Sequence, residues 1–158
     1  MMVENAKIED IGLLTELRLA YLKEDHGQLS EDDIKIIRQD LPDYFKKNLN
    51  RTIFCYLIRD KDVIVSCAFL LVVEKPMSPV FITGRTGTIL NVYTNPAYRH
   101  KGYAKEILEK LLSDAIEKNI SVVELKATED GYHLYKSVGF TDEVSKYHYM
   151  KWYNQYVE

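Results

Sequence analysis

Hydrophobic residues recur at helical spacing in three long segments of the chain. The first pattern follows Asp10, a residue type that favours helix starts, and ends near Asp25-His26-Gly27. The second follows Ser30, which together with Asp33 three residues later resembles a capping box. The third runs from about Tyr103 to Lys118 and places its apolar side chains on one face. The pattern therefore predicts three helices, of which the third is strongly amphipathic.

Pro42 lies within the second helical pattern and leaves the length of that helix open. A proline inside a helix removes one backbone donor and commonly breaks the helix. At the first position of a helix a proline is well tolerated, so Pro42 also suits a further helical turn through Tyr44 and Leu49. The sequence leaves both alternatives.

Two segments rich in β-branched and aromatic residues predict an antiparallel hairpin. They are residues 52–59 and 63–74, and the short acidic turn Asp60-Lys61-Asp62 joins them. In the register that this turn favours, Cys55 lies opposite Cys67. We expect both thiols to be buried and reduced, because two cysteines supply neither a disulfide framework nor a metal site.

Further strands and a short helix complete the expected order of elements. The pattern predicts strands at 88–94, 121–127 and 147–152 and a short helix at 130–137. The fold class is therefore α+β, with a mixed, mostly antiparallel sheet flanked by helices in a single domain of residues 1–158. A doubly wound nucleotide-binding domain is the alternative, but the chain lacks a regular alternation of strands and helices.

Composition limits the classes of function. The 158-residue chain is 46% hydrophobic and 28% charged, which is typical of a globular domain with a sizeable core. A net charge of -3 argues against general nucleic-acid binding. No apolar run approaches membrane-spanning length, and residues 1–5 do not resemble a leader, so we expect a cytoplasmic protein without membrane association. No residue cluster predicts a metal site.

The segment Arg99-His100-Lys101-Gly102-Tyr103-Ala104 carries the most specific chemical signal. A glycine turn that leads into a helix presents unpaired backbone N–H groups and the positive end of the helix dipole, which together suit a phosphate or pyrophosphate. Gly102 and Ala104 let an anion approach the backbone closely, while Arg99 and Lys101 add positive charge. An ordinary strand-to-helix connection is the alternative.

A second segment, Leu134-Tyr135-Lys136-Ser137-Val138-Gly139-Phe140, makes the first more specific. Arg-x-x-Gly-x-Ala at 99–104 resembles the acyl-CoA signature of the GNAT superfamily of N-acetyltransferases, and Leu-Tyr-x-x-x-Gly-Phe at 134–140 resembles another segment of that family. The two occur in the family's order and separation. The resemblance implies a GNAT-like sheet with a splayed strand pair at the cofactor site, and acetyl-CoA as the cosubstrate.

The resemblance also implies which residues bind the cofactor. In the family, the pantetheine arm lies in the gap beside the strand that precedes the signature, and its amides pair with exposed strand backbone. The matching residues here are Asn91, Val92, Tyr93 and Thr94. The diphosphate is expected on the backbone N–H groups of residues 100–104. Thr128 stands where many relatives carry an asparagine that contacts the cofactor.

Tyr135 is the catalytic residue that the resemblance implies. A phenol can donate a proton to the thiolate that leaves when an amine attacks a thioester; an aromatic packing residue is the competing interpretation. Some relatives place a glutamate in the fourth strand as general base, but residues 86–94 contain no carboxylate. The base is left open among Glu129, Asp130, Asp25, His26 and a water chain relayed by Tyr93.

By analogy with the family, the acceptor site lies between the junction of the first two helices and the loop before the fourth strand. This placement suggests Tyr21, Asp25, His26 and Arg85, of which Arg85 suits a substrate carboxylate or is a surface charge. The expected function is direct acetyl transfer from acetyl-CoA to a primary amine of a small molecule or peptide. A non-catalytic acyl-CoA-binding module and an interaction protein are the alternatives. A homodimer formed through the aromatic segment 147–153 is one expectation for assembly.

Overall fold

The structure, a computed structural model, describes residues 1–157. Two compact units make up the chain, with the boundary between Lys126 and Ala127. The first unit contains a five-stranded sheet in the order β1-β2-β3-β4-β5. Its strands are β1 (Val3–Asn5), β2 (Ile53–Asp60), β3 (Val63–Glu74), β4 (Arg85–Thr94) and β5 (Val122–Glu124).

The pairing of the strands confirms the expected α+β class with a mixed, mostly antiparallel sheet. The strands β1 to β4 pair antiparallel, and only β5 runs parallel to its neighbour β4. The parallel pair follows from the crossover helix between β4 and β5, because parallel strands need a long connection. β1 is too short to show a strand pattern, and sequence inspection missed it.

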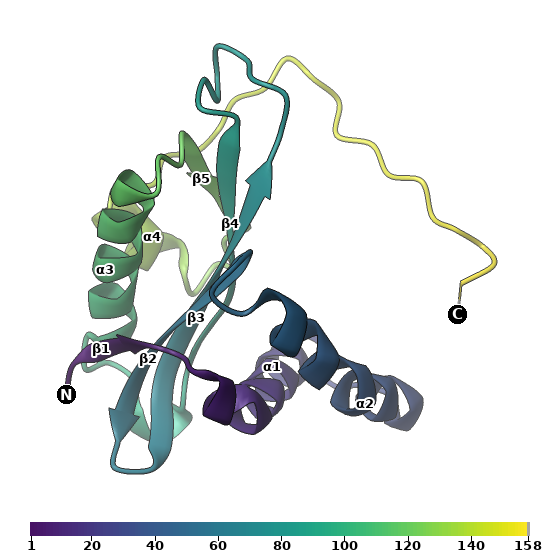
Figure 1. The fold of residues 1–158 in the computed structure, drawn as a ribbon, viewed down its shortest axis with the longest axis vertical. Helices are drawn as coiled ribbons and strands as arrows, with labels where there is room; N and C mark the ends of the chain where they lie inside the picture. The colour runs from purple at the N-terminus through teal and green to yellow at the C-terminus, as the bar shows by residue number, and fades with distance from the viewer. Residues whose placement is uncertain (158) are drawn as a thin grey trace. The chain divides into compact units, whose positions relative to one another are not determined.

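Helices cover both faces of this sheet. α1 (Ile11–His26) and α2 (Glu31–Asn48) lie on one side of the sheet, and α3 (Tyr103–Glu117) lies on the other (Figure 1). Two short 3-10 helices, η1 (Ile8–Asp10) and η2 (Pro96–Tyr98), precede α1 and α3, and α4 (Tyr132–Ser137) belongs to the second unit. None of the helices within residues 1–157 is both long enough and apolar enough to cross a membrane.

Alternating strand residues build a separate core on each face of the sheet. On the α3 side, Tyr56 is fully buried and its hydroxyl donates to Asp114 Oδ2 at 3.0 Å, which ties β2 to α3. On the other side, α1, α2 and the strands share one apolar cluster. Its buried members are Ala6, Ile11, Leu14, Phe45, Leu49, Ile53, Cys55, Leu57, Ile64, Cys67 and Phe69.

The starts of α1 and α2 differ in the way they are capped. Ser30 caps α2 as predicted, because its Oγ accepts a hydrogen bond from Asp33 N–H at 3.1 Å. Asp10 precedes α1 as predicted, but its side chain makes no hydrogen bond to that helix. Its carboxylate accepts instead from Lys7 N–H at 2.7 Å, which holds the preceding 3-10 turn.

α2 continues through Pro42, so the alternative in which the helix breaks there is wrong. The ring removes the N–H that would otherwise bond to the carbonyl one turn earlier. Packing beyond the proline offsets this loss. Phe45 is 1% exposed and lies edge-to-face on Phe69 of β3, with ring centroids 5.9 Å apart.

The predicted hairpin of β2 and β3 is confirmed, but its turn is tighter than expected. Asp60 pairs with Val63, so the turn consists of Lys61 and Asp62 alone, with Lys61 in the left-handed region at φ 57°. A second shift comes from a bulge between Ile58 and Arg59.

These two shifts overturn the predicted pairing of the cysteines. Cys55 lies opposite Phe69, and Cys67 lies opposite Leu57. Both thiols are buried and form no disulfide, as expected. They behave as small apolar side chains on the α1 and α2 side of the sheet.

The second unit contains less regular structure than the sequence predicts. The predicted strand at 147–152 is wrong, because these residues have no secondary structure and are exposed. A strand requires a neighbour to accept and donate its backbone hydrogen bonds, and no strand within residues 127–157 supplies one. At the end of the first unit, the strand predicted at 121–127 is also shorter, since β5 spans only Val122–Glu124.

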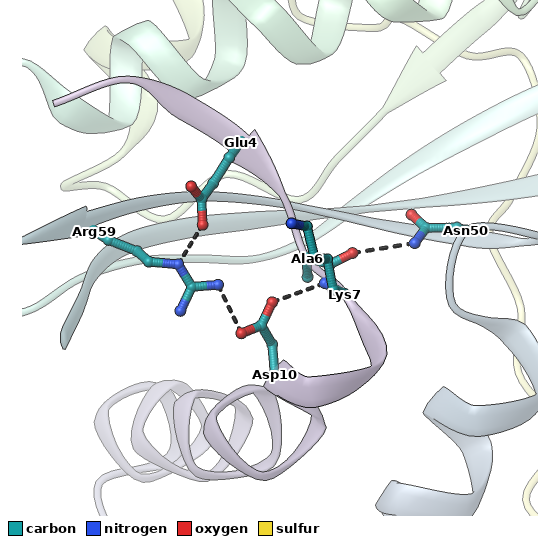
Figure 2. Close-up of polar contacts among 6 residues, drawn as sticks. All are labelled: Glu4, Ala6, Lys7, Asp10, Asn50 and Arg59. Carbon is teal, nitrogen blue, oxygen red and sulfur yellow. Dashed lines mark hydrogen bonds and ion pairs between the residues drawn. The ribbon is translucent and has the colours of Figure 1, made fainter. Parts of the chain in front are cut away.

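An ion network fixes the N-terminal segment to β2. Arg59 reaches from β2 to Glu4 on β1 and to Asp10, with Nη2 2.7 Å from Asp10 Oδ1 (Figure 2). Asn50 adds a hydrogen bond from Nδ2 to the Ala6 carbonyl at 3.1 Å. Asp10 is 8% exposed, so its charge needs these partners.

Asp10→Asn is expected to destabilise the fold by about 1–3 kcal/mol at pH 7. Burial alone would raise the pKa of Asp10, but the Lys7 N–H and the Arg59 guanidinium outweigh burial and hold that pKa below its usual 3.8. A depressed pKa stabilises the fold above the unfolded pKa, and this stability is lost as the pH falls through the folded value. Urea unfolding of both proteins between pH 7 and 3 should show the difference shrinking toward acid. The exposed turn variant Asp62→Asn is the control, and an equal effect at every pH would contradict the expectation.

Candidate active site

A bulge in β4 is the most unusual backbone feature of the first unit. Leu90 pairs with Phe69 and Tyr93 with Cys67, so Asn91 and Val92 together oppose one residue of β3. Asn91 has φ 58°, and its side chain is buried at 1% exposure. Asparagine tolerates this left-handed conformation better than most residues. The bulge re-aims the backbone of Asn91 and Val92.

Two neighbouring side chains hold the bulge. The Cys67 thiol donates to the Asn91 carbonyl at 3.6 Å, and Asn91 Nδ2 donates to Cys67 Sγ at 3.7 Å. Burial raises the pKa of Cys67 to about 12, so the thiol keeps its proton and remains a donor. Arg18 of α1 donates from Nη1 to Asn91 Oδ1 at 3.4 Å. The polar residue within this apolar strand therefore finds its partners.

Beyond the bulge, one edge of β4 carries no paired strand. β5 pairs only with Thr86, Gly87 and Thr88, whereas β4 continues to Thr94. Within residues 1–157 no other strand pairs with β4 on that side. An unpaired strand edge can accept a peptide-like chain by adding backbone hydrogen bonds. The residues predicted for the pantetheine arm, 91–94, lie in this part of β4.

The predicted phosphate cradle is a left-handed turn at the start of α3. His100 and Gly102 have φ 63° and 85°. The first helical hydrogen bond runs from Glu106 N–H to the Gly102 carbonyl at 3.1 Å, so the N–H groups of residues 103–105 have no acceptor in the helix. Apart from the chain neighbours of Gly102, a Cβ added there would meet no protein atom within 4 Å. The turn therefore offers open space beside several free backbone donors.

Arg99 is anchored within the protein. Its Nε donates to the Thr94 carbonyl at 2.9 Å, and its Nη2 lies 2.6 Å from Glu24 Oε2. The central carbon of its guanidinium lies 5.8 Å from the centre of the Tyr93 ring. The predicted positive charge at the rim is thus offset by Glu24 of α1. Lys101 is exposed and lies 5.3 Å from the centre of the Tyr98 ring.

The structure divides the predicted acceptor residues between two ends of the sheet. Tyr21, Asp25 and His26 lie in the last turns of α1, which Glu24 and Arg99 fasten to the end of β4. Burial raises the pKa of Tyr21, and the charge of Asp25 adds to this effect. Arg85 begins β4, about 30 Å away along the strand at 3.3 Å per residue. It pairs with Glu74 at 3.5 Å and does not join the other three.

The second unit places Tyr135 on α4 in close contact with its own segment. The Tyr135 ring lies edge-to-face on Phe140, with centroids 6.1 Å apart. A Cβ added at Gly131 would lie 2.8 Å from Tyr135 Cε2, so only glycine leaves room for the ring as placed. Thr128 Oγ1 accepts from Gly131 N–H at 3.2 Å, which starts the turn into α4. Glu129 and Asp130 in this turn are exposed.

Comparisons with known proteins agree with the sequence motifs. The model of the acetyltransferase (GNAT) family matches residues 14–140, and no curated protein matches the sequence. A predicted acetyltransferase of Clostridium acetobutylicum, crystallised with acetyl-CoA, is 30% identical; the match covers 94% of each chain with a TM-score of 0.81. The chain therefore belongs to the GNAT acetyltransferase family and is an acetyltransferase.

Two more distant structures show the same fold. A GCN5-related N-acetyltransferase of Ralstonia eutropha is 21% identical over 94% of this chain and 97% of that one, with a TM-score of 0.77. The glucosamine-6-phosphate N-acetyltransferase of Arabidopsis thaliana is 12% identical over 96% and 97%, with a TM-score of 0.68. Acetyl-CoA is the usual cosubstrate of the family. Among residues 1–157, no cluster of His, Cys, Asp or Glu side chains could hold a metal ion.

Proposed function

We propose that this protein transfers an acetyl group from acetyl-CoA directly to a primary amine. The observation that carries the proposal is the left-handed turn at Gly102, which opens α3 with free N–H groups beside empty space. The family match and the acetyl-CoA in the Clostridium structure support the same cosubstrate. No covalent enzyme intermediate is required, because positioning the amine against the thioester supplies much of the rate.

Main-chain groups do most of the proposed cofactor binding. The unpaired edge of β4 at Asn91, Val92, Tyr93 and Thr94 pairs with the amides of the pantetheine arm. The backbone N–H groups of residues 100–104 bind the pyrophosphate, and exposed Lys101 adds positive charge. Arg99 contributes by fixing the turn through Thr94 and Glu24. Thr128, whose hydroxyl accepts from Gly131, is the remaining proposed cofactor contact.

The proposed chemistry uses two donors, a backbone N–H and a side-chain hydroxyl. As the amine attacks the thioester carbonyl, the Val92 N–H at the bulge stabilises the developing oxyanion. When the carbon–sulfur bond breaks, the electron pair goes to sulfur and the Tyr135 hydroxyl gives it a proton. The proton lost by the amine goes to bulk water or to a base that stays unassigned, and Tyr135 regains its proton from water before the next turnover.

We also propose that the two units form one catalytic domain of the predicted 158 residues. The family model supports this, because its match runs from residue 14 to residue 140 across the boundary at Lys126. The cytoplasm is the proposed location, consistent with two buried thiols that form no disulfide. Assembly as a homodimer stays a prediction.

Acetyl-CoA and a panel of primary amines test the function, with release of free thiol as the readout. We expect amine-dependent thiol release and a saturable heat of coenzyme A binding by calorimetry. The melting temperature should also rise in excess coenzyme A, because a ligand that binds only the folded protein stabilises it by mass action. Binding without turnover of any amine would favour the non-catalytic acyl-CoA module. The absence of both would leave an interaction protein that has kept only the fold.

A further inference from the structure

Arg18 is a half-buried cation that sequence inspection did not select. It lies on the face of α1 that packs on β4, between the buried Leu14 one turn before it and Tyr21 one turn after it. Its hydrogen bond to Asn91 is long, at 3.4 Å, and runs to a neutral amide oxygen. Its guanidinium also lies 5.9 Å from the centre of the Tyr21 ring.

Arg18 differs from the other arginines in its charge balance. Within residues 1–157, no carboxylate lies within ion-pair distance of Arg18. Arg51, the other unpaired arginine, is exposed to water. The remaining arginines each pair with at least one carboxylate: Arg38 with Glu16, Arg59 with Glu4 and Asp10, Arg85 with Glu74, and Arg99 with Glu24.

A cation removed from water without a counter-ion is costly to the fold. Burial lowers the pKa of Arg18, and the nearby groups Tyr21, Tyr44 and Asp25 only partly counter this effect. Asp25, the one carboxylate among them, lies within ion-pair distance of His26, at 3.8 Å, and not of Arg18. An anion bound next to Arg18 would offset this cost and stabilise the folded protein.

We propose that Arg18 binds an anionic group, a carboxylate or a phosphate, on the acceptor amine. The guanidinium fork matches the oxygens of either group in a bidentate arrangement. This inference rests on the proposed function and adds the substrate class. Arg18 donates a hydrogen bond to Asn91 at the bulge, where the proposed reaction between the amine and the thioester takes place. An anion held by Arg18 is therefore close enough to belong to the same small molecule as the amine. The acceptor class is therefore a short amino acid or an aminoalkyl phosphate.

Matched pairs of amines test this class. The carboxylate arm compares glycine, β-alanine and 4-aminobutanoate with their amides, and the phosphate arm compares O-phosphoethanolamine with ethanolamine. We expect kcat/KM to favour the anionic member of at least one pair by about 10- to 100-fold, the range of a charge-assisted hydrogen bond. Arg18→Met should abolish that preference, and Arg18→Lys should retain part of it. The surface variant Arg38→Met is the matched control and should keep the full preference.

A purely structural Arg18, one that only supports Asn91, would make Arg18→Met slow both members of each pair equally. That result would overturn the inference but not the proposed function. The same conclusion would follow if the wild-type enzyme preferred the uncharged member of every pair. Calorimetry with the coenzyme A complex gives a second readout without turnover, and we expect the anionic amine to bind more tightly than its partner. Equal binding of the two would overturn the inference. Acetylation of no amine at all, with equal binding, would remove the proposed function as well.

Discussion

Tyr135→Phe is expected to lower kcat by about 100-fold, the lower end of the range for a positioned proton donor. The substitution removes one oxygen and keeps the ring, so the contact with Phe140 and the fit over Gly131 persist. Without the hydroxyl, the thiolate must leave unprotonated or take its proton from water. Steady-state rates with acetyl-CoA and a saturating amine provide kcat, and calorimetry with coenzyme A provides the affinity, which should stay within about twofold because the pyrophosphate contacts are untouched.

The loss should depend on pH. A phenol donates a proton only while it still carries one, so the advantage of the wild-type enzyme over Tyr135→Phe should shrink in alkaline solution. Tyr132→Phe is the matched control, because Tyr132 lies on the same helix and its hydroxyl bonds to Asp142. We expect little change in that variant. An unaltered kcat in Tyr135→Phe would remove Tyr135 from the mechanism.

Gly131→Ala offers a second route to the same residue. The backbone of Gly131, at φ -86°, accepts any side chain, so no strain arises there. The added methyl group would lie 2.8 Å from Tyr135 Cε2, and the ring must shift to relieve the contact. If Tyr135 acts as the proton donor, this shift should lower kcat while the affinity for coenzyme A persists.

The sequence predicted the secondary structure well because the signals are local. Helical spacing located α1, α2 and α3, and β-branched runs located β2, β3 and β4. The register of the paired strands is not a local signal, since it depends on the number of residues in the turn and on bulges. The bulge between Ile58 and Arg59 leaves no mark in the apolar pattern, so the facing of Cys55 and Cys67 could not be predicted.

The bulge in β4 and its partner on α1 show the same limit at the candidate active site. Asn91 did carry a signal, because a polar residue within an apolar strand needs hydrogen bonds or a cavity. Arg18, which supplies one of them, is 73 residues away in sequence. A usable hint was its place on the apolar stripe of α1 between Leu14 and Tyr21, where a charge is uncommon. Only the folded structure shows that its partner on β4 is Asn91.

Arg85 shows how the position of a residue along a strand limits which residues it can join. A loop arginine next to the fourth strand suggested a substrate anion site near the end of α1. The two ends of a strand lie far apart, however: Arg85 begins β4, whereas Tyr21 belongs to the part of α1 that contacts the other end of β4. Proximity along the sequence to an active strand is therefore weaker evidence than the end of the strand at which a residue lies.

Gly102→Val is expected to weaken coenzyme A binding by at least about tenfold, which corresponds to 1.4 kcal/mol. Gly102 has φ 85°, a conformation that costs a residue with a Cβ about 1–2 kcal/mol and a β-branched residue at least as much. This cost has one of two consequences. The turn relaxes and its N–H groups lose their common direction, or it persists and two methyl groups occupy the space where the anion must approach the backbone. Either outcome weakens the cradle.

Gly27→Val separates the effect of strain from the effect of the cradle. Gly27 ends α1 at φ 80° and ψ -42°, outside the left-handed helical region that Gly102 occupies, so the backbone penalty for valine is at least as large there. Apart from the chain neighbours of Gly27, a Cβ there would also meet no protein atom within 4 Å. Both variants should unfold at lower urea concentration than the wild-type protein, but only Gly102→Val should lose affinity for coenzyme A in calorimetry. Equal affinity in the two variants would contradict the cradle and, with it, the binding of acetyl-CoA at the start of α3.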